Sequence, residues 1–153
     1  MKQIITIILG CIHLMVPVLA QQDTRLEDNI APLVRFATLD IYIDSGDKSL
    51  AAFQFELKAG PGQIKIVGVE GGQHEAFNQP PYYDTKALMQ ERIIIAAFNT
   101  STNLPKGRTR IATVHLQITG DSEPEYELKL VVSADGDGEK IPAKISFEKG
   151  EKK

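Results

Sequence analysis

The chain of 153 residues contains one cysteine and no tryptophan. The single cysteine is Cys11, inside the N-terminal apolar segment, so the rest of the chain has neither a disulfide nor a thiol nucleophile. Its 17 basic and 20 acidic residues give a formal net charge of −3, without long runs of one sign. Binding to nucleic acid requires a basic surface, which this composition does not supply.

Recognisable catalytic and metal-binding patterns are also missing. The sequence has no G-x-S-x-G nucleophile elbow, and after the N-terminal segment it has only two histidines, His74 and His115. A zinc site needs more histidine or cysteine ligands than that. Residues 135–139 (DGDGE) resemble the opening of a calcium loop, but apolar residues stand where the later ligands would be. We expect a hairpin turn there, with weak calcium binding as the alternative, and a protein that is not an enzyme and uses no metal or cofactor.

The first twenty residues have the order of a secretory signal peptide. Lys2 precedes an apolar run over residues 4–19, and the segment ends in the small residue Ala20. We expect cleavage near Ala20 and release into the periplasm or the exterior of a bacterial cell. Two alternatives remain, namely acylation of Cys11 and an uncleaved leader that anchors the chain in a membrane.

A two-residue hydrophobic period governs the rest of the chain. Apolar residues alternate with polar ones over 37–44, 53–57, 64–69, 112–118, 126–132 and 141–147, and Gly, Pro, Asn and Asp clusters separate these segments. Residues 92–98 (RIIIAAF) are apolar on both sides, which predicts a strand buried in the middle of a sheet. Seven such strands predict one all-β domain over 34–148, an antiparallel jelly-roll β-sandwich. A flexible lead-in (21–33) and a charged tail (149–153) flank it.

The segment LAAFQFELKAGPGQIKIVGVEGG, followed by RIIIAAFN and GRTRIATVHLQITG, resembles the cohesin domain. The resemblance covers most of residues 34–147 and implies a jelly-roll β-sandwich related to bacterial carbohydrate-binding modules. It also implies a non-catalytic recognition role, since well-studied cohesins dock a dockerin partner through one sheet face. The chain departs from cohesins of cellulosomes because it shows one domain and no repeated modules. No dockerin-contacting position can be matched, so none is carried over.

The loop over residues 71–84 (GGQHEAFNQPPYYD) is the long irregular segment of the domain, and loops of this length are often functional. Asp84 predicts the start of a short helix within 83–90. The candidate partner-binding residues are the aromatic and proline residues of the loop, together with one outward-facing strand tyrosine: Phe77, Pro80, Pro81, Tyr82, Tyr83 and Tyr42. The alternative is that the loop aromatics fold back and cover one end of the sandwich.

The sequence thus predicts an exported, non-catalytic binding module that docks another exported protein, either dockerin-like or a component of the cell envelope. A polysaccharide-binding module is the first alternative, although such modules stack sugars on exposed aromatic rings and most strand aromatics here follow the buried phase. A structural envelope protein that packs through an exposed sheet edge is the second.

Overall fold

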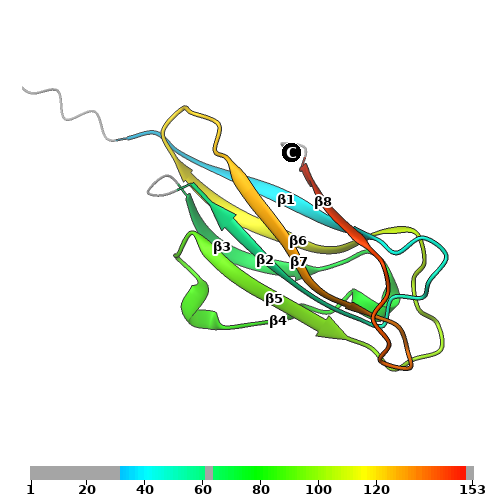
Figure 1. Cartoon of the computed structure of the whole chain (residues 1–153). Helices are drawn as coiled ribbons and strands as arrows, with labels where there is room; N and C mark the ends of the chain where they lie inside the picture. The colour runs from blue at the N-terminus through cyan, green and yellow to red at the C-terminus, as the bar shows by residue number, and fades with distance from the viewer. Residues whose placement is uncertain (1–31, 61–63, 151–153) are drawn as a thin grey trace, which may run out of the picture. The chain divides into compact units, whose positions relative to one another are not determined.

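Two antiparallel four-stranded sheets pack face to face in the computed structural model, which describes residues 32–60 and 64–150 (Figure 1). The first sheet has the strand order β3-β6-β1-β8 and the second the order β4-β5-β2-β7. The strands are β1 Val34–Asp44, β2 Ala52–Ala59, β3 Ile64–Gly71, β4 Tyr82–Tyr83, β5 Arg92–Phe98, β6 Arg108–Thr119, β7 Tyr126–Ala134 and β8 Lys144–Lys149. The prediction of an all-β antiparallel sandwich is confirmed.

Several predictions fall on parts of the chain outside the described residues. These parts are the leader, most of the lead-in, residues 61–63 of one turn and the last three residues. Cleavage near Ala20 and acylation of Cys11 therefore stay predictions. Across the described ranges, no helix has both the length and the apolar character needed to cross a membrane.

The core forms where the two-residue period points inward from both sheets. In β1, Leu39, Ile41 and Ile43 are at most 1% exposed, whereas Asp40 and Tyr42 between them lie on the outer face. The other fully buried large side chains are Leu50, Phe53, Phe55, Leu57, Ile66, Ile93, Ile95, Ile111 and Leu116. All of them belong to the unit Ala31–Lys153, which therefore has a hydrophobic core of its own.

β5 departs from its predicted burial on both sides. Ile93 and Ile95 are buried, but Ile94 is 41% exposed and Phe98 is 64% exposed. The neighbouring strand β4 pairs with only two residues of β5, so β5 lies next to the edge of its sheet. The prediction is wrong for the outward side of this strand, because the outer face of the sheet is open to solvent there.

The predicted long loop is folded into short elements. The 3₁₀ turn η1 (Glu75–Phe77) begins at His74, whose Nδ1 accepts the Ala76 N–H at 3.2 Å. The turn η2 (Thr85–Ala87) begins at Asp84, whose Oδ1 accepts the Lys86 N–H at 2.9 Å. The short helix predicted after Asp84 is thus confirmed as one 3₁₀ turn. The sequence did not predict η1 or β4.

The DGDGE segment forms a tight hairpin turn. The Oδ1 atom of Asp135 accepts the N–H groups of Asp137 and Glu139, at 3.1 and 3.0 Å. Gly138 has a φ of 82°, a left-handed conformation that glycine adopts without strain. The predicted hairpin turn is confirmed. The chain then crosses to the other sheet, where β8 begins at Lys144, three residues later than predicted, and ends at Lys149, inside the segment predicted as a tail.

Candidate functional site

The predicted loop residues divide between the core and the surface. Phe77 is 3% exposed, and its ring packs edge-on against Phe53 with centroids 5.1 Å apart. Pro81 is also buried. Partner binding by these two residues is therefore wrong, because their side chains fill the interior. The alternative, in which aromatic residues of the loop fold back over the sandwich, is correct for Phe77.

The other predicted site residues do not share one surface. Pro80 and Tyr82 are exposed, and Tyr83 is partly buried against the core. Tyr42 lies on the other sheet, where the Arg108 guanidinium carbon stands 3.6 Å from its ring centroid. Of the six predicted residues, Tyr82 alone lies on the outer face of the sheet β4-β5-β2-β7, through the pairing of β4 with β5.

We call the outer side of the sheet β4-β5-β2-β7 the open face. Strand register places its outward side chains in four rows that cross the strands. Two rows form an aromatic half, and these are Phe98–Ala52–Ala134 and Tyr82–Ala96–Gln54–Val132. Two rows form a charged half, and these are Ile94–Glu56–Lys129 and Arg92–Lys58–Glu127. One end of the open face is therefore apolar and the other is charged.

The aromatic half exposes large side chains next to small ones. Tyr82 and Phe98 are 68% and 64% exposed, their ring centroids are 6.1 Å apart, and their planes differ by 10°. Val132 is 41% exposed and Val131, beside it at a bulge, is 45% exposed. Clusters of exposed apolar side chains in a soluble domain mark interaction surfaces.

The charged half is held by ion pairs between neighbouring strands. The Arg92 Nε donates to Glu56 Oε1 at 2.7 Å, and the Lys58 Nζ lies 3.3 Å from the same oxygen. The hydrogen bond from Arg92 is the largest cause that lowers the pKa of Glu56 below its ordinary value. The Lys58 Nζ also lies 3.9 Å from Glu127 Oε2. The charged half therefore carries both basic and acidic side chains, paired with one another across β5, β2 and β7.

Sequence reasoning missed Phe98, Ile94 and Val132 as surface residues. For Phe98 and Ile94 the signal was present in RIIIAAF, because a strand with apolar residues on both sides either lies between two layers or exposes one apolar face. The strand was assigned to the first case, and the structure places it in the second. Val132 faces outward because the bulge at Val131 shifts the phase of β7 after Leu130.

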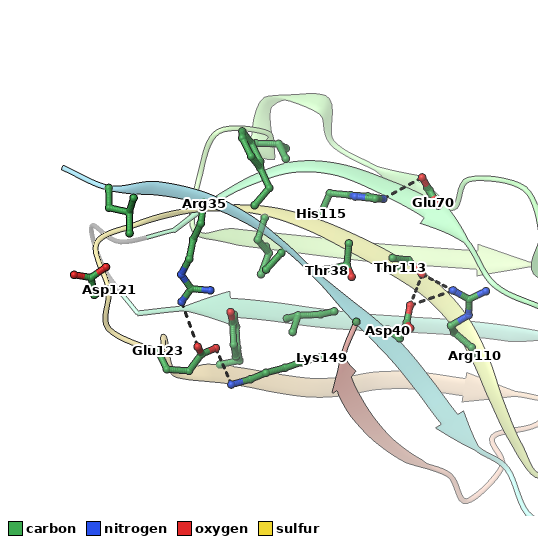
Figure 2. Close-up of a pocket in the computed structure, with 18 residues that line it drawn as sticks. Arg35, Thr38, Asp40, Glu70, Arg110, Thr113, His115, Asp121, Glu123 and Lys149 are labelled. Atoms are coloured by element: carbon green, nitrogen blue, oxygen red, sulfur yellow. Dashed lines mark hydrogen bonds and ion pairs between the residues drawn. The ribbon is translucent and has the colours of Figure 1, made fainter. Parts of the chain in front are cut away.

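A hollow lies over the other sheet, lined by residues of β1, β3, β6, the β6–β7 loop and the end of β8 (Figure 2). Asp40 Oδ1 accepts hydrogen bonds from Thr113 Oγ1 at 2.6 Å and from Arg110 Nη1 at 3.1 Å. The Arg110 Nη1 also donates to Thr113 Oγ1 at 2.8 Å. These three side chains hydrogen-bond to one another and join β1 to β6, which gives the cluster a structural role in the sheet.

Two further contacts line the hollow. His115 Nε2 lies 3.0 Å from Glu70 Oε1, but this buried nitrogen has no partner with hydrogen-bond geometry among the described residues (Figure 2). Glu123 joins the β6–β7 loop to both β1 and β8, through Arg35 Nη2 at 3.2 Å and Lys149 Nζ at 2.7 Å. The Lys149 hydrogen bond is the largest cause that lowers the pKa of Glu123.

Within the described residues, no group of three or more His, Cys, Asp or Glu side chains is arranged to hold a metal ion. His74 caps a 3₁₀ turn, and His115 lies beside a single carboxylate, that of Glu70. No protein-family model, no curated protein and no solved structure matches the chain.

Proposed function

We propose that this protein is an exported, non-catalytic binding module, cohesin-like in character, which docks a protein partner through the open face. The carrying observation is the exposed Tyr82–Phe98 pair beside the ion-paired charged half. Tyrosine and other aromatic side chains dominate binding energy at protein interfaces when they are desolvated at the centre of the contact. Polar and charged residues around such a centre exclude water and fix orientation.

The geometry supports docking because the aromatic side chains lie on strands. Phe98 and Ile94 are fixed by the pairing of β5 with β2, and Tyr82 by the pairing of β4 with β5. A side chain held by a sheet loses less conformational freedom on binding than one on a mobile loop. The open face is thus a preformed surface.

A polysaccharide is the second candidate partner. The two exposed rings lie nearly parallel, 10° apart, and sugar rings stack on exposed aromatic faces. Gln54 lies in the same row as Tyr82 and offers both a donor and an acceptor to hydroxyl groups.

Comparison of three proteins tests the proposal: residues 21–153, the double variant Tyr82→Ala/Phe98→Ala, and the control Phe36→Ala. Phe36 is 67% exposed on β1 of the other sheet, so its removal leaves the open face intact. A protein partner identified by capture from envelope extract is purified, and its affinity is measured by calorimetry. We expect the double variant to lose at least tenfold in affinity and the control to keep it.

Retention on insoluble polysaccharide, lost in the double variant, would favour the polysaccharide instead. Equal protein binding by the wild type and the double variant would refute docking through the open face.

A further inference from the structure

Strand β1 continues beyond the end of its neighbour β8 (Figure 1). The β1–β8 ladder ends at the pair Leu39–Lys149. One further hydrogen bond joins the Gly150 N–H to the Thr38 carbonyl, at 2.9 Å. On its other side β1 stays paired with β6 as far as Val34. Beside the first residues of β1, the first sheet therefore lacks its fourth strand.

We call the backbone of Val34–Thr38 on the β8 side the free edge. Backbone groups of successive residues in a strand point to opposite sides. The Leu33 carbonyl is bonded on the β6 side and the Thr38 carbonyl on the β8 side, so Val34 and Phe36 present their N–H and C=O groups to the free edge. Among the described residues, no strand pairs with them there. Unpaired backbone of this kind is a template for a further strand.

The hollow beside the free edge offers an apolar contact to such a strand. Ala37 lies on the inward side of β1, and Tyr126 of β7 lines the same hollow. Both side chains are only partly buried, and both pack against the core. A strand that continues the line of β8 would therefore bury an apolar side chain opposite Ala37.

Arg35 adds a charge to the same contact. Its Nη2 donates to the Ser122 carbonyl at 3.3 Å and to Glu123 Oε2 at 3.2 Å, whereas its Nε and Nη1 have no partner among the described residues (Figure 2). Glu123 also binds the Lys149 Nζ at 2.7 Å, so one carboxylate serves two cations. Asp121 lines the hollow but forms no ion pair with either cation in this part of the chain. A carboxylate placed opposite Arg35 can accept from its remaining N–H groups.

We propose that the free edge is a second binding site, which takes an extended segment of a partner protein as an added antiparallel strand. The segment carries an apolar residue opposite Ala37 and, two residues later, an acidic residue opposite Arg35. Hydrogen bonds to the backbone of Val34 and Phe36 supply affinity, and the two inward side chains supply specificity. The inference goes beyond docking through the open face, which lies on the other sheet.

A second copy of this chain does not meet these requirements through its own free edge. Two free edges paired antiparallel would place Arg35 opposite either Arg35 or Ala37 of the second copy, and neither offers a carboxylate. Like charges directly opposite each other on paired strands are destabilising. The structure therefore favours a segment of a different protein.

The free edge is short, which sets the expected affinity. Val34 and Phe36 each offer one N–H and one C=O group, and a strand of this length buries much less area than a standard protein interface. We therefore expect a dissociation constant of about 0.1 to 1 mM for a short peptide.

The test is a titration of isotope-labelled residues 21–153 with the probe acetyl-TVTDTT-amide up to about 5 mM, followed by nuclear magnetic resonance. The valine of the probe takes the place opposite Ala37 and its aspartate the place opposite Arg35. We expect saturable shifts of the amide signals of Val34–Thr38. A probe with lysine instead of aspartate should bind at least tenfold more weakly, and Arg35→Gln should remove most of that difference. Equal binding of the two probes by the wild type overturns the acidic requirement.

N-methylated probes test the strand pairing itself. A methyl group on the nitrogen of the threonine opposite Phe36 blocks an N–H that faces β1, and we expect at least tenfold weaker binding. A methyl group on the nitrogen of the aspartate blocks an N–H that faces away from β1, and this matched probe should bind nearly as well as the first. Equal losses for the two would show that the peptide is not paired as a strand, and would overturn the inference.

The same titration of residues 32–153 identifies the occupant. This shorter chain keeps the whole hydrophobic core, and its amide spectrum, like that of Arg35→Gln, shows whether it is folded. Binding by residues 32–153 alone would show that the chain's own N-terminal segment takes the free edge, which overturns a foreign partner. Absence of saturable shifts in both chains overturns the site altogether. Docking through the open face is decided separately, because its experiment uses residues of the other sheet.

Discussion

The rings of Tyr82 and Phe98 lie 6.1 Å apart on the outer face of one sheet, although Tyr82 follows the long loop and Phe98 ends the next long strand. The link is β4, a two-residue strand that sets Tyr82 opposite Ala96, two residues before Phe98. Residues at such diagonal positions on a sheet are within reach of aromatic side chains.

Because Phe98 is exposed, its substitution should weaken binding much more than it lowers stability. We expect Phe98→Ala to change the free energy of unfolding by about 1 kcal/mol or less, since the side chain is mostly in water and its ring packs on that of the exposed Tyr82. The same substitution should weaken partner binding at least tenfold. Urea denaturation measures the first effect, and calorimetry with the purified partner measures the second. A large loss of stability would show that Phe98 is part of the core.

The opposite result is expected for Phe77, from the same part of the chain. Its ring is buried against Phe53, so Phe77→Ala removes core contacts and leaves a cavity. We expect a destabilisation of about 3 to 5 kcal/mol. Urea denaturation of this variant beside Phe98→Ala gives a matched pair of phenylalanine truncations. Similar stabilities for the two would contradict the assignment of Phe77 to the core.

The sandwich was predictable because the two-residue hydrophobic period of each strand indicates which of its side chains face the core. Leu39, Ile41 and Ile43 alternate with polar residues, and this pattern needs no knowledge of the partner strands. The turn at Asp135 was predictable for a similar local reason, since the aspartate side chain and Gly138 define a turn by themselves.

The open face was not predictable in the same way. Whether Ile94 faces a second layer or solvent depends on what lies over the sheet. The residue pattern of β5 alone does not indicate this. Phe77 and Tyr82 stand five residues apart in one polar segment. The folded path of the chain, and not the local sequence, decides that Phe77 is buried and Tyr82 is exposed. The row arrangement required the register between β5, β2 and β7.

The hairpin turn at Asp135 and the alternative of a calcium site there can be tested against each other. Asp135→Ala removes an acceptor used by two backbone N–H groups, so we expect a loss of about 1 to 2 kcal/mol. The control Asp137→Ala, an exposed residue of the same turn, should change stability by about 0.5 kcal/mol or less. Thermal melts of the wild type should be the same with and without calcium. A calcium-dependent rise in melting temperature that Asp135→Ala abolishes would support a cation site there.

Acid stability should depend in part on Glu123, which links the β6–β7 loop to Arg35 and Lys149. Its pKa in the folded protein is lowered, first by the Lys149 hydrogen bond, so folding favours the ionised carboxylate. The stabilisation is therefore complete above the ordinary glutamate pKa of 4.5 and is lost as the pH falls through the lower pKa of the folded state.

We expect Glu123→Gln to be slightly less stable than the wild type at neutral pH and to converge with it in acid, when both are followed by urea midpoints. Glu125→Gln is the matched control, two residues along and exposed, with no ion pair to its side chain among the described residues. Because Glu123 is solvent-exposed, salt should shrink the difference between Glu123→Gln and the wild type. A difference that persists unchanged from neutral pH into acid would show that the loop is held by contacts other than the ionised carboxylate.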